Sequence, residues 1–80
     1  MDREPGRLVS GDFKSALQER LQARGETPPT YEVVAETGPS HRRRFRVRCV
    51  VAGESISEGE GHSKKEAQQV AAEAALQQLA

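Results

Sequence analysis

Apolar residues with a four-residue period predict a helix near the start of the chain, because this spacing places them on one helical face. The residues that recur at this spacing are Phe13, Leu17 and Leu21, with Ala16 beside them. Ser10 or Asp12 can cap the first turn, and Gly25 predicts the end of the helix after about 12 residues.

Two later segments alternate apolar and other residues, which is the two-residue period of a strand. The alternating positions are Tyr31, Val33 and Ala35 in the first segment, and Phe45, Val47, Cys49 and Val51 in the second. Gly38, followed by proline, predicts a hairpin loop between them. Gly53 turns the chain into a weaker third strand over Glu54–Glu58, and Gly59 and Gly61 are expected to end it.

A second helix is predicted from Ser63 onward. Ser63 and Glu66 have the spacing of a capping box, in which each side chain bonds a free backbone N–H of the first turn. The residues expected on its apolar surface are Ala67, Val70, Ala71, Ala74, Ala75, Leu76 and Leu79. The order α-β-β-β-α predicts an α+β fold, in which both helices pack on one face of a three-stranded antiparallel sheet.

The length of 80 residues allows one small domain. We assign it to residues 12–80 and interpret residues 1–11, which mix charge, Pro and Gly, as a flexible tail or interdomain linker. Hydrophobic residues make up 35% of the chain, too few for a buried active-site cavity, so no catalytic residue is expected. No apolar run approaches the roughly 18 residues of a membrane span. Cys49 is the single cysteine, which excludes a disulfide within the chain. Its apolar setting suggests a buried thiol and favours a cytoplasmic protein.

The net charge of zero argues against a nucleic-acid partner, but the distribution of charge is uneven. Residues 41–48 carry arginine without acid, and residues 54–60 carry acid without base, which predicts a local positive field. The arginines that alternate with the apolar residues should lie on the sheet face opposite the helices, where Glu32 and Glu36 can pair with them. These arginines are Arg44, Arg46 and Arg48. Arg42 and Arg43, nearer the loop, remain candidate phosphate contacts.

Lys64 and Lys65 stand in the first turn of the second helix, where the helix dipole disfavours cations by some tenths of a kcal/mol. Two ammonium groups beside free backbone amides form a concentrated positive site that suits a phosphate backbone. Two lysines exposed to solvent on a surface turn explain the pattern equally well.

Three further features suggest contacts with a nucleic-acid groove. Gln18 and Gln22 share one face of the first helix, and their amides suit the 2′-hydroxyls of A-form RNA. Ser15 and Glu19 lie beside them. His41 follows the hairpin glycine and could enter a shallow groove. An ordinary polar helix face and a solvent-exposed loop histidine are the alternatives, and no metal site is expected.

Five sequence blocks, in this order, resemble the double-stranded-RNA-binding domain family, and most of all the domain at the C-terminus of bacterial ribonuclease III. The blocks are residues 12–19 (DFKSALQE), 29–31 (PTY), 38–49 (GPSH, then FRVRC), 59–67 (GEGHSKKEA) and 71–76 (AAEAAL). The resemblance implies that the first-helix residues touch one minor groove and His41 the next. It implies that Ser63, Lys64 and Lys65 grip phosphates between them, over about 16 base pairs. Many family members carry a third lysine where this chain has Gln68.

The resemblance also implies a parent protein: a ribonuclease III-like endonuclease that cleaves double-stranded RNA. Its catalytic domain, with its magnesium ions, would be separate from this chain, which itself would need no cofactor. We expect a monomeric domain, no membrane partner, and a parent that dimerises through the catalytic domain. A stand-alone protein of the same fold that acts in protein–protein interaction or dimerisation is the alternative, favoured by the zero net charge and Gln68.

Overall fold

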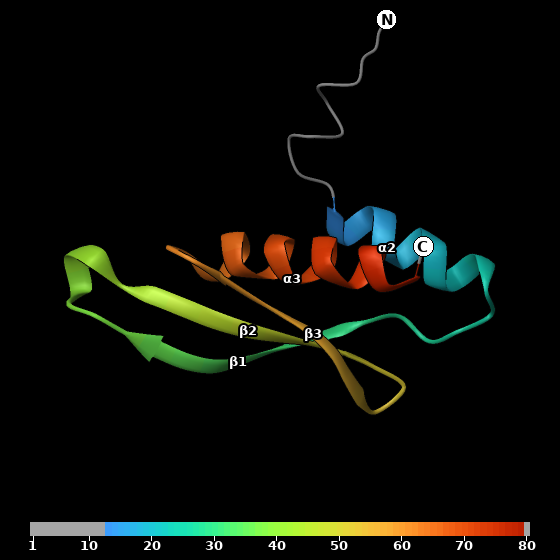
Figure 1. Cartoon of the computed structure of the whole chain (residues 1–80), viewed down its shortest axis with the longest axis horizontal. Coiled ribbons are helices and arrows are strands. Elements are labelled where there is room, and N and C mark those ends of the chain that lie inside the picture. The colour runs from blue at the N-terminus through green and yellow to red at the C-terminus, as the bar shows by residue number, and fades with distance from the viewer. Residues whose placement is uncertain (1–12, 80) are drawn as a thin grey trace, which may run out of the picture.

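The computed structural model describes residues 13–79. The elements are α2 (Phe13–Ala23), β1 (Thr30–Thr37), the 3-10 turn η1 (Ser40–Arg42), β2 (Arg44–Val51), β3 (Glu54–Gly61) and α3 (Lys64–Leu79). The strands form an antiparallel sheet in the order β1-β2-β3, and both helices lie on one side of it (Figure 1). The predicted α-β-β-β-α fold is confirmed. The proposed linker and the caps at Ser10 and Asp12 lie outside the described residues.

The core lies between α3 and the sheet, with α2 packed against α3. Its buried members are Leu17, Leu21, Cys49, Val51, Ala71, Ala72 and Ala75. Small side chains on α3 bring the helix backbone close to β2 and β3, while the two leucines of α2 fill the space beside it. None of the helices within residues 13–79 is long and apolar enough to cross a membrane.

Gly59 does not end the third strand, as the sequence had suggested, but lies buried within it, and Gly61 is its buried last residue. A Cβ added to Gly59 would lie 2.6 Å from the carbonyl oxygen of Ala67 and nearer still to the backbone nitrogen of Ala71. A Cβ on Gly61 would lie 2.8 Å from the nitrogen of Ala67. The two glycines therefore allow α3 to lie directly on β3, and the strand extends three residues beyond the predicted Glu58, to Gly61.

A β-bulge interrupts the predicted alternation in β1, because Val34 is an extra residue in the pairing with β2. After the bulge, Ala35 stands opposite Arg46 and Glu36 opposite Phe45. Since paired residues of an antiparallel sheet share a face, Ala35 moves to the outer face and Glu36 to the helix-facing side. The prediction that Glu36 lies on the outer face was therefore wrong.

Two residues expected on buried surfaces are largely exposed: Val33 is 41% and Val70 39% exposed. Val33 belongs to the edge strand β1, whereas α3 packs on β2 and β3. On α3, the packed face is formed by alanines such as Ala67 and Ala71, and Val70 lies outside it.

Helix α3 begins with a side-chain cap. The Ser63 hydroxyl accepts a hydrogen bond from the Glu66 backbone N–H at 3.0 Å, and the Glu66 carboxylate accepts one from the His62 N–H at 2.6 Å. The predicted capping interaction is confirmed, although the carboxylate reaches His62 rather than Ser63. Helix α2 ends at Ala23, and Gly25, with φ +74°, follows it as predicted.

Candidate nucleic-acid interface

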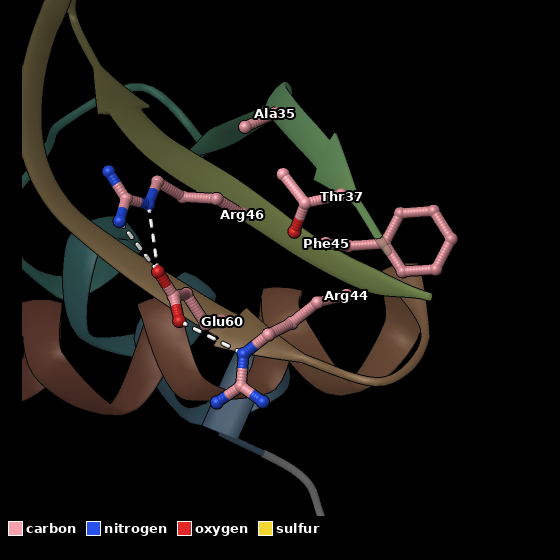
Figure 2. Close-up of a pocket in the computed structure, with 6 residues that line it drawn as sticks. All are labelled: Ala35, Thr37, Arg44, Phe45, Arg46 and Glu60. Carbon is pink, nitrogen blue, oxygen red and sulfur yellow. Dashed lines mark hydrogen bonds and ion pairs between the residues drawn. The ribbon is translucent and has the colours of Figure 1, made fainter. Parts of the chain in front are cut away.

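The outer face of the sheet carries arginines that are paired with carboxylates (Figure 2). Glu60 accepts hydrogen bonds from Arg46 Nη2 at 2.7 Å and from Arg44 Nε at 3.3 Å, on different carboxylate oxygens. These bonds, the Arg46 bond first, lower the pKa of Glu60 below its ordinary value. Figure 2 shows the Phe45 ring pointing away from these three charged groups. The basic and acidic segments of the sequence are thus neighbours on β2 and β3, and the predicted local positive field is absent from this face.

The predicted pairing of the outer arginines with β1 is correct for one residue only. Arg48 Nη1 lies 3.8 Å from Glu32 Oε1, so these two residues form the expected ion pair. Because of the bulge in β1, Glu36 instead accepts a hydrogen bond from Arg43 at 3.1 Å. Arg43 is therefore partly neutralised, whereas Arg42 forms no ion pair within residues 13–79.

The polar residues predicted on the first helix gather at one place. Four exposed side chains line a shallow depression on α2: Ser15, Gln18, Glu19 and Gln22. Leu17 and Leu21, on the opposite side of the helix, are fully buried and hold α2 against α3. The depression offers amide, hydroxyl and carboxylate groups that can donate and accept hydrogen bonds.

The loop between β1 and β2 forms a second hollow together with the turn before α3. Its lining residues are Ser40, His41, Arg42, Arg43, Phe45 and His62. Gly38, at φ +87°, folds the loop back so tightly that a Cβ there would lie 2.7 Å from the carbonyl oxygen of Arg42. His41 is thus held on a short 3-10 turn and faces the same hollow as His62. His62 was not among the predicted site residues, although it directly precedes the Ser-Lys-Lys run.

The two lysines at the start of α3 lie beside this hollow and are exposed. The Lys64 ammonium is 6.0 Å from the centroid of the Phe45 ring, a cation–π distance. Neither Lys64 nor Lys65 forms an ion pair within the described part of the chain. Their charge is therefore available to an external anion, in contrast to that of the outer-face arginines.

The side chain of Gln68 on α3 contacts a lysine of α2. Its Oε1 accepts a hydrogen bond from Lys14 Nζ at 2.5 Å, and the same ammonium lies 5.2 Å from the centroid of the Tyr31 ring. Lys14 precedes Ser15, which lines the depression on α2, and its ammonium group contacts Gln68 of α3. It was missed at the sequence level, although its four-residue spacing from Gln18 places both on one helix face.

Within residues 13–79, no group of three or more His, Cys, Asp or Glu side chains is arranged to hold a metal ion.

Comparison with known proteins agrees with the fold. A family model described as the double-stranded RNA binding motif matches residues 13–79. The chain is 52% identical over 69 residues to Ribonuclease 3 of Geobacter metallireducens, and 50% identical over 68 residues to that of Streptococcus thermophilus. These matches cover 86% and 85% of the chain but only 28% and 30% of the relatives, so the chain spans less than a third of their length.

Two solved structures share the fold. The structure of Arabidopsis HYL1, described in connection with miRNA processing, superposes with a TM-score of 0.72 at 38% identity, covering 84% of this chain and 94% of that one. Dicer from Pichia stipitis superposes with a TM-score of 0.67 at 32% identity, covering 82% of this chain and 32% of that one.

Proposed function

Because the chain belongs to the double-stranded RNA binding motif family, we propose that it binds A-form RNA duplexes by shape, as the RNA-binding module of a longer ribonuclease III-like endonuclease. The observation that carries the proposal is the distribution of free charge. The arginines of the sheet's outer face are paired with carboxylates, whereas Lys64 and Lys65 are unpaired within residues 13–79, and Lys64 lies over Phe45, which lines the loop hollow.

The depression on α2 suits the minor groove of an RNA duplex. This groove is wide and shallow in A-form RNA and exposes 2′-hydroxyls, which both donate and accept hydrogen bonds. The amides of Gln18 and Gln22 do the same, Glu19 accepts, and the Ser15 hydroxyl does either. Such contacts depend on the sugar and not on the base, so they predict binding without sequence preference.

The start of α3 suits the phosphates that flank the neighbouring major groove. Lys64 and Lys65 supply two ammonium groups, and the positive end of the helix dipole adds to their field. Ser63 is committed as the cap of the helix, which fixes the direction in which the lysines leave it. Arg42 is a further unpaired cation at the edge of the loop hollow.

The loop hollow then serves the next minor groove, which His41 enters as a planar donor and acceptor. The three contact regions together would cover about 16 base pairs. Arg43 contributes less than Arg42, because Glu36 already accepts one of its hydrogen bonds.

For the parent protein we propose cleavage of double-stranded RNA in the cytoplasm by a separate catalytic domain. That domain would hold magnesium and form a homodimer, while the present domain would remain monomeric, bind no metal and cleave nothing alone. The support is the identity of about half the aligned residues to proteins named Ribonuclease 3.

The test is the double variant Lys64→Ala/Lys65→Ala, titrated with duplex RNA at several salt concentrations. Each lost phosphate contact should lower the slope of log affinity against log salt by about 0.9, and the loss should be equal for unrelated RNA sequences. Lys64→Arg/Lys65→Arg is the matched control, which keeps both charges and should keep the slope. Unchanged binding by the alanine variant at every salt concentration would refute the phosphate site. A stable dimer in gel filtration that ignores RNA would favour a protein-interaction role instead.

A further inference from the structure

We propose that Lys14 is a third phosphate-binding cation of the interface, carried by α2 and presented to the RNA by Gln68 of α3. The inference rests on the proposed RNA-binding function and assigns a role to a residue outside the three predicted contact regions. It also gives Gln68 a function: to orient a neighbouring ammonium group.

The contacts of Lys14 hold its ammonium group in place without neutralising it. Nζ donates to Gln68 Oε1 at 2.5 Å and lies 5.2 Å from the Tyr31 ring centroid. An amide oxygen and an aromatic face both attract a cation, but neither carries a net negative charge. No carboxylate within residues 13–79 forms an ion pair with Lys14.

The paired arginines of the same chain make this arrangement informative. Each of the arginines with an ion pair meets a glutamate within 4.0 Å, and these residues are Arg24, Arg43, Arg44, Arg46 and Arg48. Lys14, Lys64 and Lys65 have no such partner in the described region. Gln68, the hydrogen-bond partner of Lys14, stands on α3 one turn after Lys64 and Lys65.

The backbone around Lys14 is fixed by the adjacent glutamine. Gln69 Oε1 accepts hydrogen bonds from the backbone N–H groups of Phe13 at 3.0 Å and Lys14 at 3.3 Å. Gln68 and Gln69 therefore act on the same turn of α2, one holding its backbone and the other directing its lysine. This double attachment sets the position of Lys14 relative to α3.

Gln68 places the ammonium group of Lys14 close to the other two lysines. Gln68 is four residues after Lys64 and three after Lys65, so the three share one side of α3 within about 6 Å of helix length. Because Lys14 is already oriented before RNA binds, little additional side-chain entropy is lost on binding. The chain thereby presents three cations where α3 alone supplies two.

The experiment compares Lys14→Gln with wild type in titrations of duplex RNA between 50 and 200 mM salt. Loss of one phosphate contact lowers the salt slope by about 0.9. The ratio of wild-type to variant affinity for duplex RNA should therefore be about three- to fourfold larger at 50 than at 200 mM salt. Lys14→Arg keeps the charge and should keep the slope. Adding Gln68→Lys to Lys14→Gln returns one positive charge to the same place and should restore the slope.

A structural role alone would give a different pattern. A lower melting temperature of Lys14→Gln with an unchanged salt slope would overturn the inference, as would a double variant whose slope stays as low as that of Lys14→Gln. If Lys64→Ala/Lys65→Ala lowers the slope and Lys14→Gln does not, only the role of Lys14 fails. If wild type does not bind duplex RNA, the proposed function fails and this inference fails with it.

Discussion

Arg46 on β2 and Glu60 on β3 face each other across the strand pair, with 2.7 Å between Nη2 and Oε2, and the second oxygen of the same carboxylate accepts a hydrogen bond from Arg44. This cluster pairs two arginines of the most basic stretch of the sequence with a carboxylate of the same domain. A chain of zero net charge can therefore still present an unpaired positive site, because Glu32, Glu58 and Glu60 pair with arginines on the sheet face opposite the helices.

The outer-face arginines are expected to contribute little to RNA binding. Arg44→Gln/Arg46→Gln removes two charges, as Lys64→Ala/Lys65→Ala does, but from the opposite face of the domain. At physiological ionic strength salt screens interactions between exposed charges that are more than about 8 Å apart, so these arginines should have little effect on RNA bound at the helices. The affinity for duplex RNA should change by less than about twofold, and the salt slope should stay that of wild type. A loss as large as that of the lysine variant, measured by fluorescence anisotropy, would place RNA on the outer face.

Gly59→Ala should destabilise the fold strongly. The added methyl group would meet the backbone of α3 at Ala67 and Ala71, which cannot move away as a flexible side chain would. We expect the free energy of unfolding in urea to fall by about 3 kcal/mol. The control is Ser55→Ala, at an exposed position of the same strand, which should change it by less than about 0.5 kcal/mol. Wild-type stability of Gly59→Ala would show that α3 does not lie on β3 in this way.

Ser63 allows the capping role to be separated from the RNA-binding role. Ser63→Ala removes the hydrogen bond to the Glu66 N–H and should lower stability by about 1 kcal/mol. Ser63→Asp keeps a capping oxygen and should retain wild-type stability, but it places a negative charge beside Lys64 and Lys65. Urea unfolding and RNA titration of both variants test this. An aspartate variant that binds RNA as tightly as wild type would contradict a phosphate contact at this turn.

The buried polar groups near Cys49 predict a loss of stability in alkaline solution. Burial raises the pKa of the Cys49 thiol, and burial also raises the pKa of Tyr31. Both groups hold their protons more tightly in the folded than in the unfolded chain. Their contribution to the free energy of unfolding is therefore fully present at neutral pH. It should decline once the pH exceeds about 8.5, where the unfolded thiol ionises.

The measurement is the urea midpoint at pH 7 and pH 10, with Cys49→Ala as the control that removes the thiol contribution. The midpoint should fall less between these pH values in the variant than in wild type. A native thiol that reacts with a disulfide reagent as fast as the unfolded chain does would show that Cys49 is not buried.

The sequence predicted those features that depend on neighbouring residues. The four-residue period of Phe13, Leu17 and Leu21 gave the first helix, and the Ser63–Glu66 spacing gave the start of the last one. Both arise from contacts within a turn or two of helix, which local spacing determines.

Features that depend on distant pairing could not be predicted in the same way. Gly59 looked like a strand end because its lack of a side chain is visible in the sequence, whereas the helix that fills the space is not. The bulge at Val34 could not be recognised because Val33 and Val34 are adjacent and identical, so either one fits the alternating pattern of a strand. The contact of Lys14 with Gln68 joins residues that are 54 positions apart.

The most direct test of RNA recognition compares duplexes of equal length, at least about 16 base pairs, that differ only in sugar or in sequence. Two RNA duplexes of unrelated sequence and the DNA counterpart of one of them are titrated under identical salt conditions. Recognition of 2′-hydroxyls and A-form shape predicts equal affinity for the two RNAs and at least about tenfold weaker binding of the DNA. Equal binding of RNA and DNA, or a strong preference for one RNA sequence, would contradict the account.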